Sequence, residues 1–243
     1  MNRLIQKTVG FIKYLYSVKN ISLTEHKMCV DAMNLPLDYL EEEADFIYQR
    51  KKIKIKECFY DFFNISRLES CWSYTNEYNE FIYGGFSFNG ISEALVLSSK
   101  FWNVFNSLNR YRPGEEELSF LKKLNWFEKQ SRGDGDGKFG CFLREPGDFP
   151  PKIYFYDSGA YFPMNTSLEE YFDAMIASCA VRGWQYFYID FPDEFPELRE
   201  VNKEKVLAEL TRTITVLPRL FPDKDFSYHE KRFYEIKEKL LRL

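Results

Sequence analysis

The segment 152–179 constrains the fold most strongly, because its pattern predicts a buried strand, a turn and one amphipathic helix. Residues 153–156 form an apolar, aromatic run that stops at Asp157-Ser158-Gly159, as a sheet strand does where it meets a turn. A helix start follows, because Thr166 or Ser167 can accept hydrogen bonds from a first helical turn and a glutamate stands three positions later. We therefore expect a strand, a turn and a helix in direct succession.

This helix is expected to bury one face against the sheet. Apolar residues recur at intervals of three and four, which places them on a single helical stripe. The stripe consists of Leu168, Tyr171, Phe172, Met175, Ile176 and Cys179. Gly183 is expected to end the helix, because glycine readily takes the left-handed conformation of a C-cap.

The composition predicts a globular protein with an aromatic core. Of the 243 residues, 45% are hydrophobic, with 24 Phe and 17 Tyr, which suits one large domain or a domain with an extension. The net charge of −4 gives no overall field that would hold nucleic acid or an anionic membrane. Five cysteines without a CxxC pair indicate free thiols in a reducing cytoplasm, and two distant histidines offer little for a zinc site. We expect a cytoplasmic protein without metal or cofactor.

The first 20 residues carry no signal-peptide core, because Lys7 and Lys13 interrupt every apolar run. Their apolar residues lie on one helical face, which could rest on a membrane surface. A helix docked on its own protein is the favoured interpretation. No segment of the sequence approaches the ~20 consecutive apolar residues of a membrane span.

Residues 22–48 are expected to form two short helices that are separated at Leu35-Pro36. The second helix carries an acidic cluster, whose members are Glu41, Glu42, Glu43 and Asp45. Such a cluster is most simply a solvated helix face, and the alternative is a binding patch. Residues 52–56 alternate lysine with isoleucine, as an edge strand guarded by charge does, although a continued helix would also fit.

The segment 81–97 predicts a β-hairpin, because Asn89-Gly90 suits a tight turn between two apolar strands. Gly84-Gly85 within the first strand indicates a bulge or a close approach of another backbone. Residues 100–151 are interpreted as an insertion between neighbouring strands, with a helix at about 115–127. A dense aromatic run at 184–190 is expected to pack beneath two final helices, at about 202–217 and 228–241.

The chain lacks the common phosphate-binding, dinucleotide-binding, hydrolase and metalloprotease motifs. The loop 132–138 contains Asp134 and Asp136, but Lys138 and Phe139 stand where a calcium loop needs an oxygen ligand and a glycine. The loop is therefore interpreted as a turn. The carboxylate pairs Asp134/Asp136 and Asp157/Asp173 could carry acid–base chemistry if burial separated their pKa values. Asp157 is expected to be a turn residue instead, and Asp173 a solvent-facing one.

The layout resembles the SUKH superfamily, which groups bacterial toxin-immunity proteins with a fungal regulator of cell-wall synthesis. The resemblance is carried by Leu35-Pro36-Leu37-Asp38-Tyr39, by the glycine-containing segment 81–97, by the strand 153–157 with its final acid, and by the helix opening at 167–175. It extends over residues 22–182. The stretch after Tyr48, the insertion 100–151 and the extension 183–243 depart from the family pattern.

The resemblance implies an α+β domain with an antiparallel sheet flanked by helices and no catalytic residues. We expect this domain to span residues 1–182, with a helical extension over 183–243 packed on it. It further implies that the sheet face or a cleft binds a partner protein, which in the bacterial branch is a toxin domain and often a nuclease. An acidic patch would suit a basic toxin. The residues we expect to bind the partner are Glu41, Glu42, Glu43, Asp134 and Asp136.

Two alternatives stay open. One is an intracellular scaffold or regulator without a toxin partner, as in the fungal branch. The other is an enzyme that uses the Gly-Asp loop and a carboxylate pair, which would require a deep pocket with converging acids.

Overall fold

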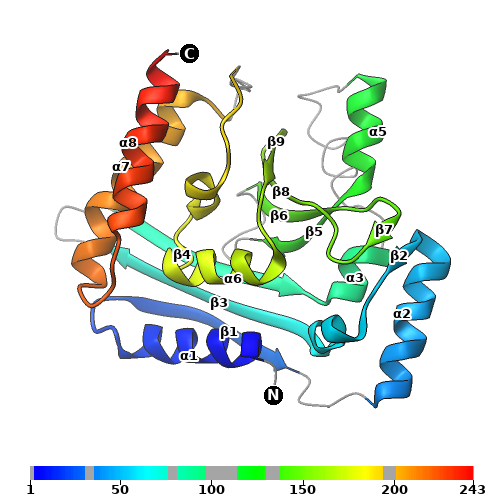
Figure 1. Ribbon diagram of the computed structural model, residues 1–243. Coiled ribbons are helices and arrows are strands. Elements are labelled where there is room, and N and C mark those ends of the chain that lie inside the picture. Colours follow the sequence, from blue (N-terminus) through cyan, green and yellow to red (C-terminus); the bar gives the residue numbers. More distant parts are fainter. Residues whose placement is uncertain are drawn as a thin grey trace.

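The protein is built on a seven-stranded antiparallel sheet with helices packed around it (Figure 1). The structure, a computed structural model, describes residues 3–30, 36–75, 81–96, 114–129, 137–193 and 201–242. The strands follow one another in the order β1-β3-β4-β5-β6-β8-β9. The predicted α+β class is confirmed.

The sheet consists of β1 (Ser22–Val30), β3 (Ile65–Thr75), β4 (Phe81–Asn89), β5 (Leu124–Lys129), β6 (Lys138–Leu143), β8 (Ile153–Asp157) and β9 (Ala160–Met164). A short parallel pair is formed by β2 (Ile53–Lys54) and β7 (Gly147–Asp148). The helices are α1 (Arg3–Ser17), α2 (Leu37–Lys51), α3 (Ile91–Val96), α5 (Glu115–Lys123), α6 (Leu168–Ala177), α7 (Lys203–Leu220) and α8 (Ser227–Arg242). Two 3-10 helices are η1 (Glu57–Asn64) and η2 (Trp184–Tyr188).

Helices α1 and α6 cover one face of the sheet, and aromatic rings join them to β4. Phe86 and Phe88 are two residues apart on this strand, so their side chains point to the same face. Phe11 of α1 stacks on Phe86 with ring centroids 6.3 Å apart, and Phe172 of α6 stacks on Phe88 at 4.3 Å. These rings are buried, as expected for a core built from aromatic residues.

The segment 152–179 folds largely as its sequence predicts. Ser167 caps α6 by accepting a hydrogen bond from the backbone N–H of Glu170, whose carboxylate accepts one from the N–H of Ser167. Leu168, Tyr171, Phe172, Met175 and Cys179 of the predicted stripe are buried, and Ile176 is half-buried. The helix ends at Ala177, six residues before the predicted stop at Gly183. The strand β9, which pairs with β8, was missed.

The sheet opens between β4 and β5, and the chain that follows α6 fills the gap. These strands pair only at Ser87↔Lys129 and Phe88↔Glu128. Farther along β4, the N–H of Gly85 donates to the carbonyl of Ala180 at 2.8 Å. A Cβ on Gly84 would lie 2.6 Å from the same carbonyl oxygen, so only glycine fits there. Of the two interpretations of Gly84-Gly85, the close backbone approach is therefore the correct one.

Three predictions for the chain before residue 152 were wrong. Residues 22–30 form β1 rather than a helix, because β3 lies beside them and completes their hydrogen bonds. The segment 81–97 is not a hairpin, since β4 runs into α3 and pairs with β3 instead. Residues 100–151 do not separate neighbouring strands, because β5 and β6 lie between β4 and β8.

The remaining helices agree with the sequence. The helix α2 forms as expected, although Leu35 lies outside the described residues, and α5 ends at Lys123, where β5 begins. The predicted edge strand is the two-residue β2. The aromatic run 184–190 lies beneath α8, as predicted.

Cys58, Cys71, Cys141 and Cys179 are free thiols. None of the described helices has the length and apolar character of a membrane span.

Candidate functional site

Three of the residues predicted to bind a partner, Glu41, Glu42 and Glu43, lie on helix α2. Lys52 ends the helix in a left-handed conformation, and its N–H donates to the Tyr48 carbonyl. The helix buries Leu40, Ala44 and Ile47, which are spaced so that they share one stripe. Through this stripe α2 packs on α3 and β2. The other residues of the helix are exposed, except for Glu43 and Lys51, which are half-buried.

The carboxylates of α2 lie outside that stripe. Glu41 and Glu42 are exposed and Glu43 is half-buried. Together with Asp38 and Asp45 they give the helix five acidic side chains against two basic ones, Arg50 and Lys51. Asp134 and Asp136 lie outside the described residues, so the structure does not join them to this cluster.

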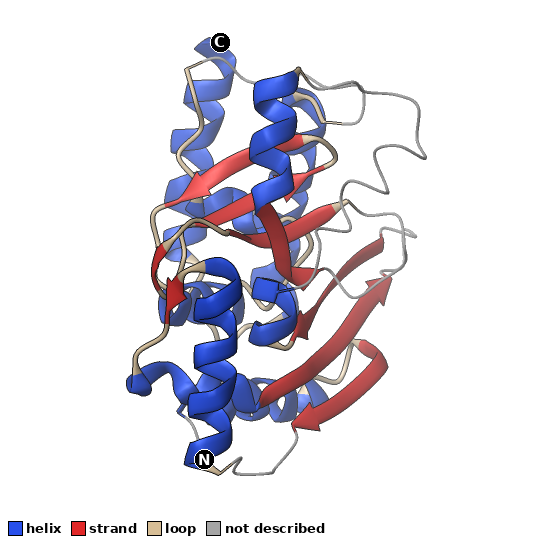
Figure 2. Ribbon diagram, turned by 90° about the vertical axis from the view of Figure 1, so that its right-hand side faces the viewer, coloured by secondary structure: helices blue, strands red, loops and turns tan. Residues whose placement is uncertain are grey.

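Helix α2 also exposes large apolar side chains, Leu37 and Tyr48 on one side of the buried stripe and Tyr39 and Phe46 on the other, which the sequence interpretation missed. The exposed fractions are 53% for Leu37, 49% for Tyr39, 42% for Phe46 and 44% for Tyr48. The helical period places Tyr39 and Phe46 away from the buried stripe at positions 40, 44 and 47, whereas Leu37 and Tyr48 fall beside it, so the sequence signals the exposure of Tyr39 and Phe46 only. We use the name α2 face for the whole exposed surface of this helix that these four residues form with Glu41, Glu42 and Glu43. Helix α2 itself lies on the outer side of the molecule, toward the viewer in Figure 2.

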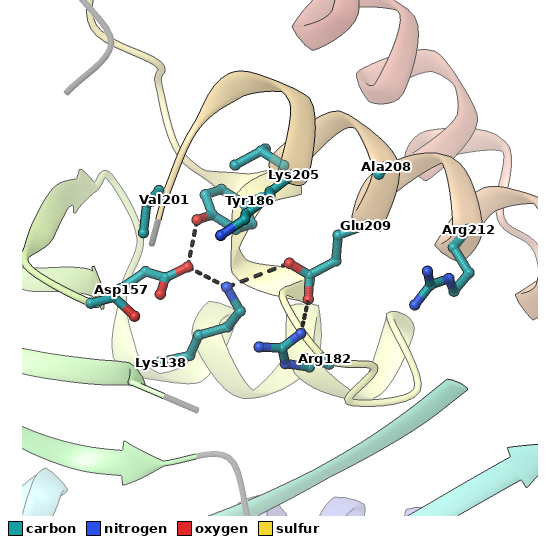
Figure 3. Close-up of a pocket in the computed structure, with 11 residues that line it drawn as sticks. Lys138, Asp157, Arg182, Tyr186, Val201, Lys205, Ala208, Glu209 and Arg212 are labelled. Atoms are coloured by element: carbon teal, nitrogen blue, oxygen red, sulfur yellow. Dashed lines mark hydrogen bonds and ion pairs between the residues drawn. The ribbon is translucent and has the colours of Figure 1, made fainter. Parts of the chain in front are cut away.

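A second candidate site is a charged pocket between the end of the sheet and α7 (Figure 3). Lys138 is the first residue of β6 and Asp157 the last of β8, and they stand opposite each other in the strand pair. Tyr186 comes from η2, and Glu209 extends from α7 toward them. The cavity has a volume of about 360 Å³. Figure 1 shows α2 and α7 at opposite ends of the molecule, so the two sites are separate.

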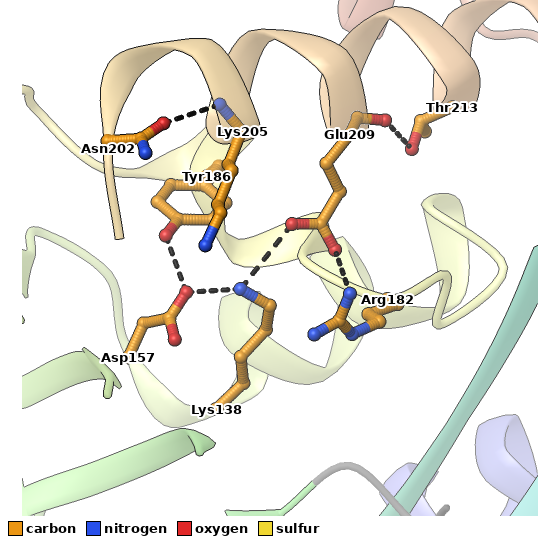
Figure 4. A network of polar contacts seen from close by, with 8 residues as sticks. All are labelled: Lys138, Asp157, Arg182, Tyr186, Asn202, Lys205, Glu209 and Thr213. Carbon is orange, nitrogen blue, oxygen red and sulfur yellow. Dashed lines mark hydrogen bonds and ion pairs between the residues drawn. The ribbon is translucent and has the colours of Figure 1, made fainter. Parts of the chain in front are cut away.

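A network of ion pairs forms the floor of this pocket (Figure 4). The Tyr186 hydroxyl donates a 2.6 Å hydrogen bond to Oδ2 of Asp157, and Lys138 Nζ donates to the same oxygen. Lys138 Nζ also lies 3.4 Å from Oε2 of Glu209, whose Oε1 lies 3.5 Å from a guanidinium nitrogen of Arg182. Lys138 thus bridges two carboxylates that come from β8 and α7.

Burial governs the chemistry of this network. The side chains of Lys138 and Asp157 are each only 5% exposed, and that of Glu209 is 19% exposed. Burial, followed by the neighbouring Asp157 carboxylate, raises the pKa of the Tyr186 hydroxyl well above its usual value. Tyr186 therefore stays protonated and acts as a hydrogen-bond donor to Asp157.

The expectation for Asp157 was wrong and that for Asp173 was correct. Asp157 is the last residue of β8 and precedes a turn, but its carboxylate is buried and accepts hydrogen bonds from Lys138 and Tyr186. Asp173 is half exposed on α6 and pairs with Lys7 at 2.6 Å. The two carboxylates line different pockets, so they do not form the proposed acid–base pair.

The described residues contain no group of three His, Cys, Asp or Glu side chains that could hold a metal ion. Comparison with models of protein families, with curated proteins and with solved structures gives no match. The α2 face and the charged pocket are therefore interpreted from their own geometry.

Proposed function

We propose that this chain is a protein-binding module, an immunity protein of the SUKH type that neutralises a basic toxin domain by direct contact in the cytoplasm. The observation that carries the proposal is the α2 face, where four exposed apolar side chains lie among carboxylates. Aromatic residues are enriched at protein interfaces, where a rigid ring buries a large area at little entropic cost. Such a face on a soluble helix is a favourable docking surface.

The negative charge of α2 favours a partner with a basic surface. Five carboxylates against two cations attract a basic surface, raise the rate of encounter and repel acidic proteins. A nuclease toxin carries such a basic surface, because it must hold a phosphate backbone. The immunity protein would cover that surface and exclude the nucleic acid.

The rest of α2 supports a rigid presentation of this face. Leu40, Ala44 and Ile47 fix the helix on α3 and β2, so little order has to be gained on binding. The guanidinium carbon of Arg50 lies 4.5 Å from the centre of the Phe46 ring, which holds that ring in place. A preformed, anchored helix loses less entropy on association than a mobile one.

Co-expression with a toxin domain, where one is encoded next to this gene, tests the proposal. We expect the wild-type chain to protect the cell and to co-purify with the toxin. Reversing two charges, Glu41→Lys with Glu42→Lys, should abolish both. The matched control reverses Glu230 and Glu238, two exposed acids of α8 on the other side of the molecule, and should leave protection intact.

Equal protection by both double variants would contradict the assignment of the α2 face. If the wild-type chain neither protects nor co-purifies, the immunity function is wrong. An isolated gene without a neighbouring toxin would favour the scaffold or regulator.

A further inference from the structure

A groove between α6 and α8 has the size of a small-molecule site. Its volume of about 680 Å³ falls within the range of ligand pockets. Its lining comes from α6 and the residues before it, from the end of η2 and the residues after it, and from the start of α8. Figure 1 shows α8 and α2 on opposite sides of the molecule, so this α6–α8 groove is separate from the α2 face.

The groove carries negative charge. Its described lining contains four carboxylates and one guanidinium group, which belong to Glu170, Asp173, Asp190, Asp225 and Arg232. Arg232 is already balanced, because its guanidinium group pairs with Glu235 at 2.7 Å and donates to two backbone carbonyls. Asp173 is balanced by Lys7 at 2.6 Å. The carboxylates of Glu170, Asp190 and Asp225 therefore supply the net charge.

Among the described residues, these three carboxylates accept hydrogen bonds from neutral donors only. Glu170 and Asp225 each accept one from a backbone N–H, at 2.8 and 2.9 Å, and Asp190 accepts one from the amide of Asn165 at 3.3 Å. The backbone hydrogen bonds hold the pKa of Glu170 and of Asp225 below the usual value, so both are ionised at neutral pH. The N-termini of α6 and α8 each offset roughly half a charge, which leaves about two negative charges in the groove.

An aromatic wall lies among these carboxylates. Tyr228 is 48% exposed, and its ring stacks on that of Tyr188 with centroids 5.2 Å apart. Both residues line the groove. The face of a tyrosine ring attracts an organic cation, and its carbon atoms pack against an alkyl chain. The groove thus offers apolar contact between its charged positions.

His229 also lines the groove and adds no positive charge to it. Burial lowers the pKa of this ring to about 4, so the ring is neutral at pH 7. The Ser178 hydroxyl donates to the Ala174 carbonyl at 2.7 Å, so Nε2 of His229, 2.9 Å from that hydroxyl, carries the proton of the ring. Its Nδ1 is then a buried acceptor without a partner among the described residues, and a nearby cation stabilises such a group.

The negative charges are spread along the groove. The described residues contain no group of three His, Cys, Asp or Glu side chains that could hold a metal ion, although three carboxylates and His229 line this one cavity. A compact dication therefore cannot meet them together. A cation whose two charges are separated by an alkyl chain can, because each charge reaches a different carboxylate.

We propose that the α6–α8 groove binds an aliphatic diamine in its diammonium form. Its two charges balance the two that remain in the groove, whereas a monoamine leaves half of them uncompensated. The ammonium groups would donate charge-assisted hydrogen bonds to the carboxylates. The chain between them would lie against Tyr228 and Tyr188.

Calorimetric titration at a pH of about 7, where alkylamines are protonated, tests the proposal with diaminobutane, butylamine and magnesium chloride. We expect diaminobutane to bind at a ratio of one to one, and more weakly as salt is added. Butylamine should bind several-fold more weakly, and magnesium ions should not bind measurably. Absence of saturable binding by diaminobutane, or equal binding of either other probe, would overturn the proposal.

Substitution of one carboxylate locates the binding. Asp190→Asn keeps the shape of an exposed side chain and should weaken diaminobutane binding roughly tenfold, as expected for the loss of one charge-assisted contact. Asp193→Asn is the matched control, because this carboxylate is fully exposed three residues farther along and does not line the groove. Equal affinity of the Asp190 variant and the wild type would contradict the site. Circular dichroism checks that both variants are folded.

The ring of His229 reports on the ligand directly. The chain has two histidines, so their ring signals can be followed by NMR, and His229→Gln assigns them. Diaminobutane should shift the His229 signal, and the shift should saturate at the affinity that calorimetry gives. His26, on β1, is the control. Saturable binding that leaves the His229 signal in place would locate the ligand elsewhere and contradict the proposal.

Discussion

The hydroxyl of Tyr171 donates a 2.9 Å hydrogen bond to Oε2 of Glu128, and both side chains are fully buried. Gln185 donates to the same oxygen from 3.2 Å. The three residues join α6, β5 and η2 beside the opening between β4 and β5. Burial raises the pKa of Glu128 to about 8, although these hydrogen bonds act in the opposite direction. A protonated carboxyl group is thus held in the core at neutral pH.

Glu128 makes the fold less stable as the pH rises. Between pH 4.5 and about 8 the unfolded chain ionises this carboxyl while the folded chain keeps it protonated, so the free energy of unfolding falls with pH. Glu128→Gln removes that contribution. We therefore expect the free energy of unfolding of the variant, minus that of the wild type, to increase by up to about 1.4 kcal/mol for each pH unit between pH 4.5 and about 8. Urea denaturation across this range measures it, and a constant difference between the two proteins would refute the prediction.

His229 imposes the opposite dependence. Its Nε2 lies 2.9 Å from Oγ of Ser178, and burial lowers the pKa of the ring from 6.5 to about 4, against a smaller opposing effect of Asp225. Between these values the unfolded chain takes up a proton that the folded chain does not, so stability falls as the pH drops. In His229→Gln, the free energy of unfolding, measured by urea denaturation, should not show this decrease between pH 6.5 and about 4. An unchanged acid transition in that variant would show that His229 does not cause it.

Gly140 provides the space that lets Tyr171 reach Glu128. A Cβ at this position would overlap the Tyr171 hydroxyl and lie 3.2 Å from the ring of Phe127. Gly140→Ala should therefore lower the free energy of unfolding by about 1–3 kcal/mol, as overpacking does in a close-packed core. Gly10→Ala is the control, because no atom lies within 4 Å of its Cβ and alanine favours the helix α1. Thermal unfolding compares them, and equal stability of the Gly140 variant and wild type would contradict the packing described.

Lys138 is the cation on which the buried network depends. Lys138→Met leaves the carboxylates of Asp157 and Glu209 without their shared partner, so we expect a loss of about 3–5 kcal/mol in unfolding free energy. Lys123→Met breaks a 2.9 Å pair with Glu145 that is nearly half exposed, and it should cost less than about 1 kcal/mol. Adding Asp157→Leu to Lys138→Met should recover part of the loss. Equal effects of the two lysine substitutions would show that the network is not buried in solution.

Local patterns predicted the elements whose signals lie within one segment. The capping box at Ser167 and the stripe that follows it are such signals, and the two C-terminal helices are others. The strand β1 was missed because its partner, β3, lies some 40 residues away, and pairing with it overrides the local helix signal at Ser22. The predicted hairpin failed because a short apolar run after Gly90 fits a helix as well as a strand.

The two candidate sites also differ in whether a single segment of the sequence contains their signal. Glu41 and Glu42 could be found from the sequence because their exposure follows from the helical period of α2. The charged pocket could not, since Lys138, Asp157 and Glu209 come from distant segments and meet only through the sheet register and the docking of α7. Nothing near Asp157 in the sequence indicates that its carboxylate is buried.

The α2 face is tested most directly by the affinity of the isolated complex with the neighbouring toxin domain, measured by calorimetry. Tyr39→Ala with Phe46→Ala should weaken binding by at least about 30-fold, the equivalent of a 2 kcal/mol hot spot. The control, Tyr234→Ala, removes an aromatic side chain that is 58% exposed on α8 and should not change the affinity. Equal affinities for the wild type and the α2 double variant would contradict the central claim.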